Sequence, residues 1–245
     1  MYYIDCAGGV AGDMLLGAFL DQHDVDRART VSSLEGAAAV MAPTKITTSI
    51  VDVLGTKARM IQVEFPHTRH HISGLELRSY IEKACDVLGL VSGKAFALEC
   101  LDDILHAECR VHNEPLNEIH LHETGTPDTI VDLCGVGLFY EKMDLAREGV
   151  QATPISVGAG KLRISHGLVD VPAPATRLLL EGLRFNAGPV PSELATPTGI
   201  AVLRNLVKGF VDRIPEDAIT LGVSTGTKRF ETERFVNILR LCRGG

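Results

Sequence analysis

The sequence has few cysteines and no closely spaced pair of them. Its six cysteines are scattered along 245 residues, and none belongs to a CxxC pair. This spacing argues against a thiolate zinc knuckle and gives no sign of a disulfide framework. We expect most of these cysteines to be small buried hydrophobic residues, as free cysteines usually are. Cys6 is left open, because it lies in a glycine-rich turn where a thiolate could be stabilised.

Basic residues and long apolar stretches are also scarce. Lys and Arg number 24 against 31 Asp and Glu, which gives a net charge of -7. A protein that neutralises nucleic-acid phosphates would carry the opposite balance, so we expect no DNA partner. No apolar stretch has the length of a membrane helix, and the start, MYYIDCAGG, lacks the basic residues and apolar core of a signal peptide. We therefore expect a cytoplasmic protein with no membrane partner.

The composition that is present is typical of a folded protein. Hydrophobic residues make up 45% of the chain and charged residues 22%, which is too apolar for disorder. A chain of this length can form one large domain or two modest ones, each with a core of its own. We expect a single domain over residues 1–245, and its division into subdomains of about 1–148 and 149–245 is left open.

The hydrophobic pattern of the first part predicts both strands and helices. Residues 2–5 predict a strand, which the glycine-rich turn CAGGVAG joins to a helix over 14–20. Alternating β-branched residues over 46–53 and 58–65 predict an antiparallel hairpin with Gly55 in its turn. Helical spacing over 75–111 predicts two helices, and a further helix is predicted to begin at Pro127, because proline suits the first helical position.

The last part is rich in Pro, Gly and Thr. This composition predicts short strands and ordered loops, with helices over 177–181 and 199–207. A hairpin combined with strand–helix units favours a mixed sheet over a purely parallel one. We therefore predict a mixed α/β fold, α+β-like, in which helices pack against a mixed sheet that contains a β-hairpin.

Imidazoles and carboxylates gather in the stretch EIHLHETGTPDTIVD, residues 118–132. If IHLHE is extended, His120 and His122 share a face, with Glu123 at the end of the strand. Asp128 and Asp132, one turn apart on the following helix, can face those imidazoles. Such a nitrogen and oxygen site suits nickel, zinc, iron or manganese and does not choose among them. The alternative is a packed loop with hydrogen-bonded histidines and a carboxylate that caps the helix.

Other histidines lie in predicted loops. HTRHH contributes His67, His70 and His71 after the hairpin, either as a metal entry site or as solvated polar chain. His166 lies before the rigid turn VPAPAT, where an ordinary turn hydrogen bond is the structural alternative to a role in chemistry.

The glycine-rich turn resembles a phosphate-binding loop, because it follows a strand and opens a helix. Gly9 and Gly12 would let backbone amides approach an anion. Asp5 and Asp13 would repel that anion unless a metal intervened, and as hard ligands they suit Mg²⁺ or Mn²⁺. The structural alternative is that the glycines only let the helix pack close to the strand.

Two threonine-rich stretches offer similar groups. ELATPTG, which contains Thr196 and Thr198, and GVSTGT present backbone amides and hydroxyls to an anion, or form tight turns.

Taken in order, DCAGGVAGDM, VHNEPLNEIHLHETGTPDTIVDLCG, SHGLVDVPAPAT and ELATPTG resemble the LarC family, the nickel insertion proteins of nickel-pincer nucleotide cofactor biosynthesis. The similarity extends from residue 2 to about residue 242 and covers the N-terminal part of full-length members. Ala7 and Gly8 depart from the aromatic residue and serine usual in the family. Thr124 and Thr126 stand where small apolar residues are more usual.

The resemblance implies insertion of nickel into pyridinium-3,5-bisthiocarboxylic acid mononucleotide, with formation of a nickel–carbon bond. It implies a nickel-inserting lyase, a cyclometallase, that uses CTP and a divalent metal when full length. The family's C-terminal domain, which supplies the CTP site, would begin beyond this chain. Either a separate C-terminal chain supplies that site as a partner, or this protein has a narrower role, and a homo-oligomer is left open.

The resemblance also gives the candidate residues roles. Nickel is expected at His120, His122 and Glu123, together with Asp128 or Asp132. Glu123 or His166 is expected to accept the proton that the ring carbon loses.

The remaining candidates are expected around the nucleotide. Asp5 and Asp13 would hold a hard metal, Mg or Mn, or the substrate phosphate through that metal. Backbone and hydroxyl contacts to the nucleotide are expected from Gly9, Gly12, Thr196 and Thr198.

Two other function classes fit the same residues. A non-enzymatic nickel carrier or assembly subunit would bind nickel without a nucleotide and show no turnover. A metal-dependent phosphohydrolase would use the same carboxylates and histidines to activate water, and would hydrolyse a simple phosphoester.

Overall fold

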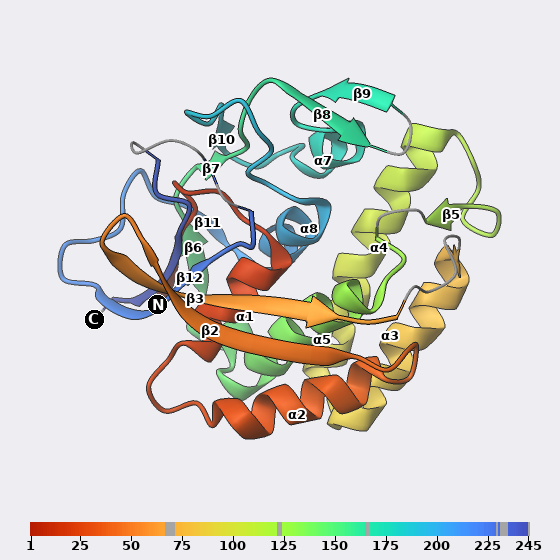
Figure 1. Ribbon diagram of the computed structural model, residues 1–245, viewed down its shortest axis with the longest axis horizontal. Coiled ribbons are helices and arrows are strands. Elements are labelled where there is room, and N and C mark those ends of the chain that lie inside the picture. The colour runs from red at the N-terminus through yellow and green to blue at the C-terminus, as the bar shows by residue number, and fades with distance from the viewer. Residues whose placement is uncertain (67–71, 122–123, 165–166, 229, 231–234, 245) are drawn as a thin grey trace.

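The computed structural model describes residues 1–66, 72–121, 124–164, 167–228, 230 and 235–244. Helices pack against a mixed seven-stranded sheet, as Figure 1 shows, which confirms the predicted α/β class. The helices are α1 Gly12–Leu20, α2 Arg27–Ala38, α3 Gly74–Leu88, α4 Ser92–His112, α5 Pro127–Lys142, α6 Leu145–Glu148, α7 Pro174–Leu179 and α8 Pro197–Leu206.

The main sheet contains strands from both ends of the chain. Its order is β11 (Gly209–Phe210), β6 (Val150–Ala152), β1 (Tyr2–Asp5), β13 (Leu239–Arg243), β12 (Ile219–Thr225), β3 (Thr56–Glu64) and β2 (Lys45–Val53). The pairs β1 with β6, β6 with β11 and β3 with β12 are parallel. The pairs β1 with β13, β12 with β13 and β2 with β3 are antiparallel. The first and last strands are therefore neighbours in the middle of the sheet.

The remaining strands form short two-stranded pairs. These strands are β4 Ile72–Ser73, β5 His120–Leu121, β7 Ile155–Ser156, β8 Lys161–Ile164, β9 Gly167–Asp170 and β10 Phe185–Asn186. β4 pairs with β5, β7 with β10 and β8 with β9. The many short strands in the Pro-, Gly- and Thr-rich part confirm the prediction for that region.

The predicted hairpin is the longest feature of the sheet. β2 and β3 pair over nine residues each, and the turn passes through Leu54 and Gly55, which both have positive φ. Alternation places Ile46 in the core, which fixes the face that the hairpin presents to the core. The hairpin therefore holds the end of β3 over the helices, as Figure 1 shows.

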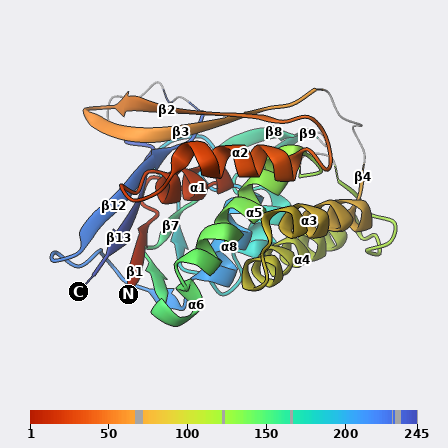
Figure 2. The same cartoon turned by 90° about the horizontal axis from the view of Figure 1, so that it is seen from below.

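The helices gather on one side of the main sheet (Figure 2). α1 contacts both the sheet, through β12 and β3, and helix α5. Its nine residues are almost all buried, and Phe19 stacks on Phe139 of α5 with ring centroids 5.3 Å apart. α1 and α5 therefore sit at the centre of the molecule and position whatever their first turns carry.

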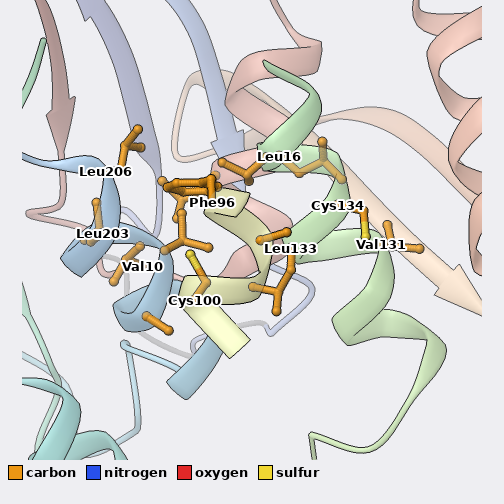
Figure 3. Packing of buried hydrophobic residues seen from close by; sticks show 14 of the residues in the cluster. Val10, Leu16, Phe96, Cys100, Val131, Leu133, Cys134, Leu203 and Leu206 are labelled. Carbon is orange, nitrogen blue, oxygen red and sulfur yellow. The ribbon is translucent and has the colours of Figure 1, made fainter. Parts of the chain in front are cut away.

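A continuous apolar core joins these helices, as Figure 3 shows. Leu16 of α1, Phe96 and Cys100 of α4, Leu133 of α5 and Leu203 of α8 are all buried in it. Five of the six cysteines are buried and all six are free thiols, which confirms the prediction of apolar cysteines. No helix in the described part of the chain is long and apolar enough to cross a membrane.

The structure departs from the predicted elements in three places. α7 begins at Pro174, three residues before the predicted start, because Pro174 takes the first helical position. α2 was not predicted, since its sequence RARTVSSLEGAA buries only four residues and carries a weak apolar stripe. The extended stretch predicted over IHLHE is described as a strand only at His120–Leu121.

Candidate functional site

Three helices begin around one cavity of about 770 Å³. α1 starts at Gly12, α5 at Pro127 and α8 at Pro197, and the first turn of each lines the cavity. The walls also include the end of β3 (residues 61–64) with Phe65, and the stretch 226–228 after β12. Backbone N–H groups at helix N-termini carry partial positive charge, so this arrangement favours negative groups in the first turns.

Three aspartates line the cavity, and two of them occupy those favoured positions. Asp13 lies in the first turn of α1, and its Oδ1 accepts a hydrogen bond from the Met14 N–H at 2.8 Å. Asp128 lies in the first turn of α5, and Asp132 lies one turn further along the same helix. All three side chains line the cavity, so two helices bring three carboxyl groups to one place.

Burial and mutual repulsion disfavour the charged form of these groups. Burial, and then the charge of Asp128, raise the pKa of Asp13 from its ordinary value of 3.8 to about 7. Burial raises the pKa of Asp128. Burial, Asp128 and Asp13 raise the pKa of Asp132 well above its ordinary value, against a hydrogen bond from Thr198 that lowers it. Binding of a cation or a proton to this cluster is therefore favourable.

Two buried polar atoms of cavity-lining residues have no hydrogen-bond partner among the described residues. They are Oδ1 of Asp132, whose residue is 3% exposed, and Oγ1 of Thr124, whose residue is 6% exposed. Leaving a buried polar atom unsatisfied costs about 1–3 kcal/mol. Both residues line the cavity, so their free atoms indicate a ligand that supplies a positive charge or a donor at this point.

The closeness of α1 to Asp132 depends on Gly12. A Cβ at residue 12 would lie 2.1 Å from Oδ2 of Asp132, a distance that no side chain tolerates. The alternative drawn from the sequence was close packing of the helix against the strand, whereas the close contact of Gly12 is with the Asp132 carboxyl group of α5.

The outer part of the cavity has a different character. Lys228 is exposed, and its Nζ lies 5.9 Å from the centre of the Phe230 ring. Phe65 and Phe230 are half-buried and also line the cavity. Among the described lining residues, Lys228 is the one Lys or Arg, against five carboxyl groups.

The structure brings together six of the residues that the sequence singled out. Four of the stretches singled out in the sequence meet at the cavity, because their helices and loops start or end there. The lining residues that were predicted are Gly12, Asp13, Asp128, Asp132, Thr196 and Thr198. Thr196 caps α8 by accepting a hydrogen bond from the Gly199 N–H at 3.3 Å.

Three other candidates lie elsewhere. Asp5 forms an ion pair with Arg240 (3.1 Å) and accepts a hydrogen bond from Thr153, and it does not line the cavity that Asp13 lines. Gly9 has φ +102° and packs against Leu194. The side chain of His120 is exposed on β5, where it pairs with Ser73 of β4.

The other predicted residues lie outside the described part of the chain. They are His67, His70, His71, His122, Glu123 and His166. Within the described ranges, no three His, Cys, Asp or Glu side chains are arranged so that they could hold a metal ion. The described carboxylates are therefore a negative cluster and not a complete set of metal ligands by themselves.

Several lining residues were not predicted as site residues. Lys228 and Phe230 follow the GVSTGT stretch, which carried a weak signal through its hydroxyls and amides. Phe65 at the end of the hairpin and the buried Asn237 had no sequence signal that marked them as site residues. Only the folded arrangement brings these residues to the helix N-termini.

The fold and cavity define a mixed α/β protein with an acidic site at three helix N-termini. Among solved structures, none matches this chain. The profile of the family described as nickel insertion protein matches residues 2–244, and the chain belongs to this family.

Individual relatives support this placement. A protein of Rhodopirellula baltica is 32% identical over 244 residues, which is 99% of this chain. Proteins named pyridinium-3,5-bisthiocarboxylic acid mononucleotide nickel insertion protein are 30% identical over 97% of the chain in Staphylococcus saprophyticus and 32% identical over 99% of it in a Nocardioides species. The chain spans 59%, 58% and 59% of the length of these three relatives.

Proposed function

We propose that this chain takes part in inserting nickel into pyridinium-3,5-bisthiocarboxylic acid mononucleotide, the compound in the names of two relatives. The observation that carries this proposal is the carboxylate cluster of Asp13, Asp128 and Asp132, with the unpartnered Oδ1 of Asp132 in the cavity wall. Family membership supplies the reaction class, and the cavity supplies a place for it.

The chemistry of the reactants suits an acidic cavity. A nickel ion and a pyridinium ring are both positively charged, so the same carboxylates favour both and reduce the repulsion between them. Formation of a nickel–carbon bond replaces a ring C–H bond and releases one proton, which a base must accept. The described bases at the cavity are these carboxylates, and Glu123 and His166 stay candidates from the sequence.

The substrate can supply donors that the described residues lack. Its thiocarboxylate groups are soft ligands, while carboxylates are hard and imidazoles are intermediate. We propose that nickel is held between the substrate sulfurs and the cavity carboxylates, and His120, which does not line the cavity, and His122 stay the candidate imidazole ligands from the sequence. Mg²⁺ or Mn²⁺ at Asp13, bound to the substrate phosphate, is the corresponding proposal for a hard metal.

A second chain is part of the proposal. This chain covers about three-fifths of the length of its relatives. We propose that a C-terminal partner with a CTP site takes part in the reaction, and turnover is expected to rise when such a chain is supplied.

Nickel titration by calorimetry on metal-stripped protein tests the proposal. The wild type is compared with two double variants, Asp128→Asn/Asp132→Asn and His120→Ala/His122→Ala, and with Asp170→Asn, an exposed control outside the cavity. We expect the aspartate variant to lose at least tenfold in affinity and the control to match the wild type. Absence of nickel binding by the wild type would contradict the proposal.

The histidine variant separates the two predicted metal regions. Loss of affinity in that variant alone would place the nickel site in the HLHE stretch and not in the cavity.

Mass spectrometry of the mononucleotide, incubated with nickel and a C-terminal chain, then reports metallation. Tight nickel binding without metallation would favour a carrier over an enzyme.

A further inference from the structure

Charge is unevenly distributed across the cavity. Asp132 is 3% exposed, whereas Lys228 lies exposed at the rim beside Phe230. The inner wall is therefore acidic, and the rim carries one cation next to an aromatic ring together with the exposed carboxylate of Glu64. A ligand that matches this pattern has a positive or donor-bearing group at one end and an anion at the other.

The unpartnered atoms show which end goes inward. When the Asp132 carboxyl group is ionised, its Oδ1 can only accept, so it then needs a donor or a positive charge. Oγ1 of Thr124 is a separate buried atom without a partner, and it can accept or donate. A phosphate placed at the inner wall would meet helix N-termini, which favour it, but also three carboxyl groups, and the like-charge contact with their ionised forms disfavours that orientation.

We propose that the cavity binds a pyridinium mononucleotide in one orientation, with the cationic ring inward against the carboxylates of Asp132, Asp128 and Asp13 and the phosphate outward at Lys228. This inference rests on the proposed function for the substrate class, and it adds the residues that select the ring charge and the phosphate. The cavity volume of about 770 Å³ is within the range of small-molecule sites, roughly 300–1,000 Å³.

The orientation has a chemical consequence for the proposed reaction. It brings the ring carbons to the end of the cavity where the carboxylates are, and keeps the phosphate away from them. A nickel ion drawn to those carboxylates would then meet the ring and its sulfur groups. The reverse orientation would separate the ring from every carboxylate of the cluster.

Three nicotinamide compounds test the two ends of the proposed ligand separately. Nicotinamide mononucleotide has a pyridinium cation and a phosphate, its reduced form has a neutral ring and the same phosphate, and nicotinamide riboside has the cation without the phosphate. Dissociation constants are measured for all three with the metal-free wild type, Asp132→Asn and Lys228→Ala. Lys161→Ala and Asp170→Asn, which alter an exposed pair outside the cavity, are the matched controls.

We expect the wild type to bind the oxidised mononucleotide about tenfold more tightly than the reduced form, as a charge contact in a cavity would give. Asp132→Asn should abolish this preference and keep the preference for mononucleotide over riboside. Lys228→Ala should keep the preference for the oxidised ring and lose the preference for mononucleotide over riboside. Both controls should behave like the wild type. Asp128→Asn serves as the second carboxylate variant if Asp132→Asn does not fold.

Several results would overturn the orientation. They are equal binding of oxidised and reduced mononucleotide, an unchanged ring-charge preference in both carboxylate variants, loss of that preference in Lys228→Ala, or no binding of any probe. If nickel binding and metallation persist alongside such a result, the proposed function stands and the orientation alone fails. If the probes discriminate as expected but nickel neither binds nor inserts, the proposed function fails instead.

Discussion

At the residue scale, Asp13 links the site to stability. Its folded pKa is about 7 against an ordinary value of 3.8, so between about pH 4 and pH 7 the folded protein keeps a proton that the unfolded chain has lost. The contribution of Asp13 to the free energy of unfolding is therefore full below pH 4 and is lost as the pH rises through 7. Asp13→Asn removes this dependence.

Urea unfolding of the wild type and Asp13→Asn at pH 4.5, 6 and 8 measures the effect. Relative to the wild type, the variant should gain stability steadily toward pH 8. Three pKa units correspond to about 4 kcal/mol, and water in the open cavity makes the measured gain smaller. Asp170→Asn is the control, because burial is not the main influence on its pKa, which Lys161 lowers. A pH-independent difference between wild type and Asp13→Asn would contradict the raised pKa.

At the element scale, the start of α1 is fitted to the side of α5. A Cβ on Gly12 would meet the Asp132 carboxyl group, whereas Gly36 in the last turn of α2 has nothing within 4 Å of its own Cβ position. Gly12→Ala should lower the free energy of unfolding by about 1–3 kcal/mol, as overpacking does, and weaken nickel binding. Gly36→Ala should raise it by about 0.5–1 kcal/mol, because alanine is the better helix former.

The two glycine variants form a matched pair, since each adds one methyl group to a helix. Chemical denaturation gives the stability change, and calorimetry gives the nickel affinity. Wild-type affinity in Gly12→Ala would show that the contact between α1 and Asp132 does not position the carboxylate.

The elements that could be predicted from the sequence are those with strong local signals. Pro127 at the start of α5, the alternation of β2 and β3 around Gly55, and the strand at residues 2–5 all carried such signals, and the structure confirms them. α2 has a polar sequence, and its position depends on contacts with α3, α5 and β2 that no local pattern records.

At the scale of the whole molecule, the same distinction applies to the site. Helical spacing placed Asp128 and Asp132 on one face of α5 from the sequence alone. Their approach to Asp13 depends on the packing of α1 against α5, and the position of Lys228 depends on where β12 ends in the sheet. Local residue chemistry was therefore predictable, whereas the convergence of three helix N-termini required the tertiary structure.

That convergence predicts how nickel should stabilise the molecule. A ligand that binds only the folded state at a concentration 100 times its dissociation constant adds about 2.7 kcal/mol. For a chain of this size, such a gain raises Tm by about 5–10 °C. Nickel must displace protons from Asp13, Asp128 and Asp132, whose pKa values are all raised, so the increase in Tm should grow from pH 5 to pH 8.

Thermal scans with and without nickel, at both pH values, measure this increase, and a chelator should reverse it. The Asp128→Asn/Asp132→Asn variant should show a much smaller increase at pH 8, while Asp170→Asn should match the wild type. An equal increase in the double variant would mean that nickel stabilises the fold from another position, such as the predicted HTRHH cluster. An increase that does not depend on pH would mean that the metal binds without displacing carboxyl protons, and the acidic cavity would then not be its site.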